Sequence, residues 1–187
     1  GKKEYFFKNN SALKLINIGR FTEQKDQITI LRAINYLKKE LNFRLIIIGH
    51  GDKKQKLVNF IKKNHLSKSV KINDTITNPY GVLNQSDVFI LSSKFEGLPN
   101  VLLEAAALKK FIISTKCPSG PKEILLNGKG GLFFKIGNYK DLSNKILFYS
   151  KNKRKLNKKI QATFKNLNKY DYDRNLKKYY DLVSRFI

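Results

Sequence analysis

The sequence predicts an α/β fold in which helices cover both faces of a parallel sheet, and three observations support this. Short apolar runs alternate with longer amphipathic stretches, which is typical of repeated βα units. The runs lack the polar alternation of half-exposed strands, so they are expected to be buried on both sides. The stretches between them carry apolar residues at helical spacing. We therefore expect a doubly wound sheet of about six strands with C-terminal helices.

Each expected element can be placed on the sequence. The strands are expected at residues 13–19, 43–49, 69–73, 87–93, 110–116 and 131–136. Asp26 can cap the first helix. The apolar face of that helix is formed by Ile30, Leu31, Ile34 and Leu37, and that of the next helix by Leu57, Phe60 and Ile61. Beyond residue 140 the chain becomes lysine-dense helix, and its last helix is expected to pack on another surface.

Composition limits the domain count and the compartment. The 187 residues suffice for one ordinary domain, and a chain that begins at Gly1 without any methionine is expected to be a piece of a longer protein. We divide it into a lead at residues 1–13, an α/β domain at 14–150 and basic helices at 151–187. A single cysteine, Cys117, fits a reducing compartment. Without a signal peptide or a run of roughly 20 apolar residues, a soluble or peripheral protein is expected.

The net charge of +24 suggests nucleic acid or an anionic membrane as a partner. A drift of base composition toward A and T explains the same charge, because lysine, asparagine and isoleucine are abundant together. Both explanations stay open on composition alone.

Ligands of open α/β sheets bind beyond the carboxyl ends of the strands, so the turns there are the candidate site. The first turn, GRFTEQKDQ, has Gly19 at the strand end, and Arg20 and Lys25 offer cationic donors for phosphate. The second turn, IIIGHGDKKQ, fails as a dinucleotide fingerprint because Lys54 stands where the third glycine belongs. Its glycines, on either side of the turn residue His50, still allow the backbone to approach a flat ligand closely.

The third turn, SSKFEGLPNVLLEA, places two carboxylates around a helix start. Asn100 is expected to be the N-cap, and the free N–H groups of residues 101–103 should attract phosphate. Glu96 precedes the cap and Glu104 lies about one turn inside the helix, so a diphosphate could lie between them. Carboxylates accept hydrogen bonds from the hydroxyls of a sugar and a ribose. From these residues alone, a merely helix-stabilising role for Glu104 is equally acceptable.

The fourth turn, KCPSGPKEILLNGKGG, is a rigid turn before a short helix. Its exposed N–H groups are expected to face the same strand ends. Cys117 is interpreted as structural, because no histidine is placed to activate it as a nucleophile.

Together these residues resemble the retaining glycosyltransferases of the two-Rossmann-domain (GT-B) architecture, in the large group 4 class. GRFTEQKD is similar to the G-R-(x)4-K element of that family, and Glu96 and Glu104 match its E-x7-E element. CPSGPKEIL resembles the turn after the next strand. The resemblance covers nearly the whole chain and implies the second, donor-binding Rossmann-like domain. Residues 1–13 would then be a linker remnant, and residues 151–187 would pack on this domain or on the absent N-terminal one.

The resemblance implies a role for each site residue. Arg20 and Lys25 would bind the donor diphosphate and stabilise the leaving nucleotide, which is electrostatic catalysis without a metal or other cofactor. Glu96 would hold the sugar hydroxyls as the third catalytic residue, and Glu104 would accept from the ribose. The base would lie against the Gly49–Gly51 turn and residues 71–75. The donor-binding set is Gly19, Gly49, Gly51, Thr75, Gly97, Leu98, Pro99, Asn100, Val101 and Glu104.

We therefore expect the donor-binding domain of a hexosyltransferase that uses a UDP-sugar to extend a glycan, lipid-linked or cell-surface acceptor. It would be cytoplasmic, with peripheral binding to the inner membrane face left open, and inactive without its acceptor domain. The alternatives are a basic nucleic-acid-binding module and a sugar-nucleotide epimerase of the same plan. Asp171 and Asp173 spell D-x-D, but they lie far from any expected strand end and are discounted as a metal site. The sugar, the base, the acceptor and the oligomeric state cannot be read from the sequence.

Overall fold

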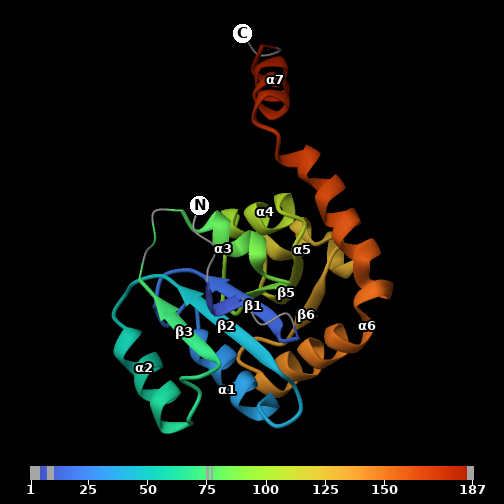
Figure 1. The fold of residues 1–187 in the computed structure, drawn as a ribbon. Coiled ribbons are helices and arrows are strands. Elements are labelled where there is room, and N and C mark those ends of the chain that lie inside the picture. Colours follow the sequence, from blue (N-terminus) through green and yellow to red (C-terminus); the bar gives the residue numbers. More distant parts are fainter. Residues whose placement is uncertain (1–4, 8–10, 75, 77, 185–187) are drawn as a thin grey trace.

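The computed structural model describes residues 5–7, 11–74, 76 and 78–184 (Figure 1). Its sheet has six parallel strands in the order β3-β2-β1-β4-β5-β6. The strands are β1 (Leu13–Ile18), β2 (Phe43–Ile48), β3 (Val70–Asn73), β4 (Val88–Leu91), β5 (Phe111–Thr115) and β6 (Leu132–Phe134). The predicted doubly wound parallel sheet is confirmed, with each strand inside the range expected from its apolar run.

Helices cover the sheet on both faces (Figure 1). The helices are α1 (Gln27–Leu37), α2 (Lys54–Lys63), α3 (Tyr80–Gln85), α4 (Asn100–Ala107), α5 (Pro121–Ile124), α6 (Tyr139–Asn166) and α7 (Tyr172–Val183), with 3-10 turns at Tyr5–Phe7, Leu126–Gly128 and Leu167–Tyr170. α1, α2 and α6 contribute to one hydrophobic core, and α3, α4 and α5 contribute to the other. Successive strand residues alternate between the cores, as Leu15 and Ile16 do, because side chains alternate along a strand.

The predicted face of α1 is buried as expected: Ile30, Leu31, Ile34 and Leu37 are each 1% exposed or less. Asp26 stands at the N-cap position of α1 with a left-handed backbone (φ 46°), and its carboxylate accepts a hydrogen bond from the Thr29 hydroxyl at 2.7 Å. Burial raises the pKa of Asp26, and the Thr29 hydrogen bond opposes this shift. The start of α1, which follows the first candidate turn, is therefore well fixed.

Of the two C-terminal helices, α6 packs on the sheet through Leu142 and Ile146, whereas α7 extends away from it. α6 is continuous from Tyr139 to Asn166 apart from an irregular residue at Asn152, so the expected boundary at residue 150 falls inside it, and the domain division stays a prediction. α7 projects from the body of the molecule (Figure 1). Its apolar side chains Tyr172, Leu176 and Tyr180 are exposed, and the surface on which they were expected to pack stays a prediction. Among the described helices, none has the length and apolar character needed to cross a bilayer.

Candidate functional site

The site lies at the carboxyl ends of the four central strands. β1 and β4 are neighbours in the sheet, and the strand order reverses between them. Such a switch point separates the turns of adjacent strands and opens a crevice for ligands. The four turns selected from the sequence follow β2, β1, β4 and β5, which are adjacent strands in that order. The fold therefore brings all four turns to one edge of the sheet.

The turns after β1 and β2 are joined through their backbones. The N–H of Phe21 donates to the His50 carbonyl at 2.7 Å, and the N–H of Lys53 donates to the Phe21 carbonyl at 3.0 Å. A Cβ atom at Gly49 would lie 2.0 Å from the carbonyl oxygen of Gly19, and the φ of Gly49 is 156°. The immediate reason for glycine here is thus the approach of two protein turns. The predicted contact of this turn with a ligand stays a prediction.

An apolar cleft of about 190 Å³ opens beside these two turns. It is lined by Ile18, Gly19, Arg20, Ile48, Gly49, His50, Ile76 and Pro79. Gly19, Arg20 and Gly49 were all selected from the sequence, and the structure brings them together in one cleft. Gly51 lies in the same turn and is exposed, whereas Thr75 lies outside the described residues. The cleft suits a flat, partly apolar group.

Arg20 carries its positive charge at the mouth of this cleft. Its residue is exposed, and its carbonyl accepts a hydrogen bond from the Gln27 amide at 2.9 Å, which fixes the backbone. Within the described part of the chain its guanidinium has no hydrogen bond or ion pair. A fixed backbone with an uncommitted guanidinium leaves five donors for an anion.

Lys25 and Glu96 form an ion pair that links the turn after β1 to the turn after β4. Lys25 Nζ lies 2.6 Å from Glu96 Oε1, and the two side chains are 18% and 7% exposed. The hydroxyl of Ser93 donates to the same oxygen at 2.5 Å. Two of the three residues expected to be catalytic are therefore in direct contact, across 71 positions of sequence.

A set of hydroxyl groups, which the sequence analysis missed, fixes this pair in place. Ser92 Oγ donates to the Lys25 carbonyl at 2.7 Å, and Thr115 Oγ1 donates to the Ser93 carbonyl at 2.6 Å. Ser119 Oγ donates to the Glu96 carbonyl at 2.6 Å. A signal was present in the sequence, because the apolar runs of β4 and β5 each end in two hydroxyl residues, SS and ST. A hydroxyl that is buried at a strand end needs a hydrogen-bond partner.

The start of α4 corrects one expectation. Asn100 is the first residue of α4 and not its N-cap, which is Pro99 in an extended conformation without a side-chain capping bond. The N–H of Leu102, expected to be free, donates to the Pro99 carbonyl at 2.9 Å, because the first turn closes tightly on that carbonyl. Gly97, Leu98 and Asn100 are exposed. The helix start thus offers fewer free donors than expected.

The remaining residues of the third and fourth turns lie beside this helix start. Val101 and Glu104 are half-buried, and the Glu104 carboxylate has no hydrogen bond or ion pair within the described ranges. A Cβ atom at Gly120 would lie 2.0 Å from the Gly97 carbonyl oxygen, so the fourth turn lies directly against the third. Cys117 is fully buried, and burial raises the pKa of its thiol although a hydrogen bond with Thr115 opposes the shift. A protonated, buried thiol is a poor nucleophile, as its structural interpretation requires.

The D-x-D sequence serves the backbone of α7. Asp171 Oδ1 accepts a hydrogen bond from the N–H of Arg174 at 2.8 Å, which is the bond of a helix cap. In the part of the chain that the structure describes, no three His, Cys, Asp or Glu residues are grouped so that they could hold a metal ion.

The fold and this edge define a Rossmann-like α/β domain of the kind found in GT-B glycosyltransferases. Residues 2–166 match the family described as "Glycosyl transferases group 1", and the chain belongs to this family. It is 41% identical over 125 residues to an uncharacterized glycosyltransferase (MJ1059) of Methanocaldococcus jannaschii, covering 66% of this chain and 31% of that protein. A Campylobacter jejuni N-acetylgalactosaminyltransferase is 31% identical over 124 residues, covering 66% of this chain and 33% of that protein. The chain thus spans about a third of the length of these relatives.

Solved glycosyltransferase structures have the same fold. TarM of S. aureus superposes with a TM-score of 0.83 at 22% identity, covering 92% of this chain and 35% of that chain. HepE of Anabaena superposes with a TM-score of 0.84 at 16% identity, covering 94% of this chain and 49% of that chain. At these identities the superpositions establish the fold and not the ligand.

Proposed function

We propose that this domain binds the nucleotide-sugar donor, a UDP-sugar, of a retaining hexosyltransferase. The observation that carries the proposal is the Lys25–Glu96 ion pair at the switch point, between an apolar cleft and the start of α4. A cation and a carboxylate side by side match a donor that carries a diphosphate next to a sugar.

Each part of the donor has a matching part of the site. The base enters the apolar cleft beside Gly19 and Gly49, and the predicted base-binding residue Thr75 directly precedes the cleft residue Ile76 in the sequence. The diphosphate lies between the Arg20 guanidinium and the Lys25 ammonium, which has three donors and can meet a phosphate while it contacts Glu96. The turn from Gly97 to Val101, in which Gly97, Leu98 and Asn100 are exposed, completes the phosphate site, and Glu104 accepts from the ribose.

Transfer breaks the bond between the sugar and the diphosphate, so negative charge grows on the leaving nucleotide. Lys25, held by Glu96, stabilises that charge from a fixed position, and the uncommitted Arg20 guanidinium adds a second cation, so no metal ion is needed for this electrostatic stabilisation. Glu96 holds the sugar hydroxyls while the bond breaks. This assigns the three residues the catalytic roles that the sequence analysis gave them.

The names of related proteins support a nucleotide-sugar donor and a glycan acceptor. HepE was crystallised in complex with UDP-glucose, and TarM in complex with UDP and alpha-GlcNAc-glycerol. The name of the Campylobacter jejuni relative gives a diphospho-undecaprenol-linked glycan as its acceptor, and another relative is a capsular polysaccharide glycosyltransferase of Staphylococcus aureus. We propose a glycan, lipid-linked or cell-surface acceptor here, held by an N-terminal acceptor domain outside this chain. On its own the chain would bind donor weakly and transfer little or nothing.

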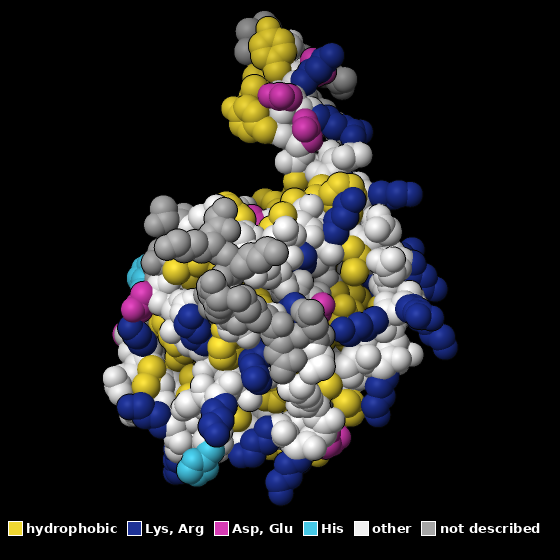
Figure 2. Space-filling model, viewed as in Figure 1, with side chains coloured by type: hydrophobic (Ala, Val, Ile, Leu, Met, Phe, Trp, Pro, Cys, Tyr) yellow, Lys and Arg dark blue, Asp and Glu magenta, His cyan; other side chains and the backbone are white. Residues whose placement is uncertain are grey.

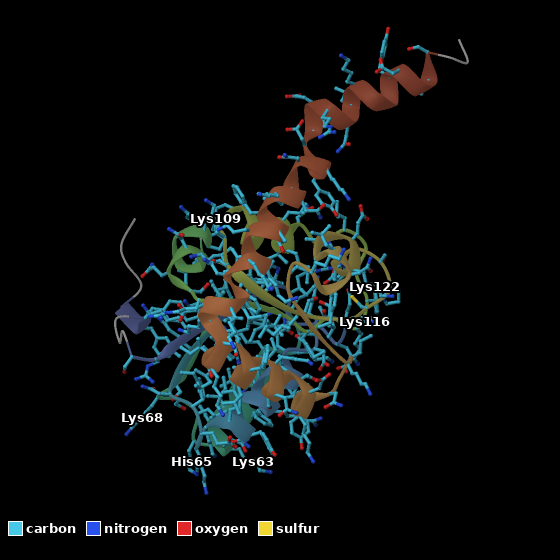
Figure 3. The ribbon with its side chains drawn as sticks, turned by 90° about the vertical axis from the view of Figure 1, so that its right-hand side faces the viewer. Lys63, His65, Lys68, Lys109, Lys116 and Lys122 are labelled. Atoms are coloured by element: carbon cyan, nitrogen blue, oxygen red, sulfur yellow. The ribbon has the colours of Figure 1, made fainter. Side chains whose placement is uncertain are left out.

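The Lys and Arg side chains form no separate candidate site on the faces that Figures 2 and 3 show. Figure 2 shows Lys and Arg side chains spread over the visible surface rather than gathered in one groove. In Figure 3, Lys63 and Lys68 lie low on the main body of the molecule, and Lys109 lies in its upper part. Such a spread suits general attraction to an anionic membrane at the cytoplasmic face better than one nucleic-acid groove.

Calorimetric titration with UDP, GDP, UDP-glucose and UDP-N-acetylglucosamine tests the proposal. We expect UDP and a UDP-sugar to bind, and Arg20→Ala or Lys25→Ala to weaken UDP by about tenfold or more, because each removes a charge-assisted hydrogen bond. Arg32→Ala, which removes an exposed arginine at the middle of α1, and Lys68→Ala are the matched controls and should bind as the wild type does. Equal binding by Arg20→Ala, Lys25→Ala and the wild type would contradict the assignment.

A further inference from the structure

We propose that Ser93 is a positioning residue that fixes the orientation of the Glu96 carboxylate and so lets the domain distinguish sugars. Ser93 and Lys25 together occupy Oε1 of Glu96, and Oε2 is left to accept a hydrogen bond from a hydroxyl of the donor sugar. This inference rests on the proposed donor-binding function and concerns the sugar end of that same site.

Both donors converge on one oxygen. Lys25 Nζ is 2.6 Å and Ser93 Oγ is 2.5 Å from Glu96 Oε1. Within the ranges that the structure describes, Oε2 makes no hydrogen bond or ion pair. An ionised carboxylate has about four acceptor positions, so the oxygen that stays open is an acceptor prepared for a hydroxyl donor.

Ser93 is itself held rigidly. It is fully buried, and its carbonyl accepts the hydroxyl hydrogen bond of the fully buried Thr115 at 2.6 Å. Glu96 is held at its backbone as well, where its carbonyl accepts from Ser119 Oγ at 2.6 Å. Two neighbouring strands and the turn after β5 thus fix both the donor and the acceptor of the Ser93–Glu96 bond.

Without the Ser93 hydroxyl, the lysine alone would not fix the carboxylate. The last torsion of glutamate is broad and roughly two-fold, so the carboxylate can turn about it. A half-turn only exchanges two equivalent oxygens, but at intermediate angles the ammonium, a point charge with three rotatable donors, keeps its contact while the second oxygen points elsewhere. The Ser93 hydroxyl selects one orientation and keeps Oε2 directed at the sugar.

The consequence is a division of roles that binding data can separate. Ser93 touches no part of the apolar cleft, whose lining includes Arg20 but neither Ser93 nor Glu96. The affinity for the nucleotide should therefore be independent of Ser93. The additional affinity that the sugar brings should depend on it, since a site built to hydrogen-bond a hydroxyl discriminates strongly against its loss.

Dissociation constants for UDP, UDP-glucose and UDP-N-acetylglucosamine test the inference in wild type, Ser93→Ala and Ser93→Thr. We expect wild type to bind one UDP-sugar more tightly than UDP, and Ser93→Ala to reduce that ratio by about tenfold while the constant for UDP stays within about twofold. Ser93→Thr keeps the hydroxyl and should retain the ratio. Ser114→Ala is the matched control, because Ser114 is also fully buried but its hydroxyl donates to the Thr115 carbonyl.

Each other outcome has a defined meaning. An equal loss for UDP and the UDP-sugar in Ser93→Ala, or an unchanged ratio, overturns the role of Ser93 while UDP binding by the wild type upholds the donor site. A wild type that binds UDP but neither UDP-sugar more tightly overturns the role of Ser93 and upholds the nucleotide site. A wild type that binds neither UDP nor a UDP-sugar overturns both. Should Ser93→Ala fail to fold, Thr115→Val replaces it, because this variant keeps Ser93 but removes the hydrogen bond to its carbonyl. A lowered ratio of UDP-sugar affinity to UDP affinity then supports the inference, and an unchanged ratio contradicts it.

Discussion

The two edges of the sheet are built from different interactions. At the amino edge, the ring of Phe111 stacks on that of Tyr149 from α6 at 4.4 Å, and Asp87 Oδ2 accepts from the N–H of Lys14 at 2.9 Å. At the carboxyl edge, buried hydroxyls and close glycine contacts fix the Lys25–Glu96 ion pair. One edge depends mainly on filled volume, and the other depends on individual polar atoms.

This difference separates stability from binding. Filling volume at the amino edge is worth several kcal/mol, and conservative changes of shape are tolerated there. A hydroxyl at the carboxyl edge contributes about 1 kcal/mol to stability, but its position decides whether a carboxylate is directed correctly. Substitutions that unfold the protein should therefore lie at the amino edge, and those that impair binding in a folded protein should lie at the carboxyl edge.

The largest expected effect on stability is at the amino edge. Phe111→Ala removes a fully buried ring stacked on Tyr149 and should lower the free energy of unfolding by about 3 to 5 kcal/mol. Urea denaturation would measure the loss as a lower midpoint with an unchanged m-value. The folded fraction should still bind UDP with wild-type affinity, and a specific loss of UDP binding would contradict the separation of the two edges.

A smaller loss is expected where the two turns of the carboxyl edge meet. Gly49→Ala places a Cβ atom 2.0 Å from the Gly19 carbonyl oxygen at a φ of 156°, so the first two turns must move apart. We expect about 2 to 3 kcal/mol of destabilisation in urea, together with weaker UDP binding. Gly81→Ala is the control, because no atom lies within 4 Å of its Cβ position and Gly81 has no place in the proposed site. Unchanged UDP binding by a folded Gly49→Ala would show that the contact between the turns is not needed for the site.

The strands were predicted well from the sequence, because a strand that is buried on both faces is apolar along its whole length. The carboxyl end of β4 shows where this prediction fails. The expected strand ran to residue 93, but β4 ends at Leu91 because the Ser92 and Ser93 hydroxyls bond to the Lys25 carbonyl and to Glu96. The partner of Ser92 lies 67 positions away in the sequence, and that of Ser93 lies 3 positions away. A local sequence pattern cannot reveal both partners.

The candidate site was predictable in its members but not in its contacts. Spacing selected Lys25 and Glu96 separately, and only the fold pairs them across 71 positions. Asn100 was assigned as the N-cap from residue preference, but Pro99 takes that position in an extended conformation, and its carbonyl accepts from Leu102. Ser93 was missed because the pair of serines that ends the apolar run of β4 indicates that a buried hydroxyl needs a partner, but it does not identify Glu96 as that partner. The roles of all these residues toward a donor stay predictions until binding is measured.

The smallest expected effect is a pH dependence at the amino edge. Burial, and then the nearby charge of Asp87, raises the pKa of Tyr149 from 10.0 to about 12. Because the folded state holds the phenol protonated, this contribution to stability is complete below pH 10 and is lost as the pH rises through about 12. Tyr149→Phe cannot ionise and does not lose this contribution, so its stability relative to the wild type should rise by about 1 kcal/mol between pH 7 and pH 11. Both proteins are denatured at each pH, so that the effect of lysine titration, which they share, cancels in the difference between their free energies of unfolding. A difference that stays constant across this range would mean that Tyr149 ionises as readily in the folded protein as in the unfolded chain.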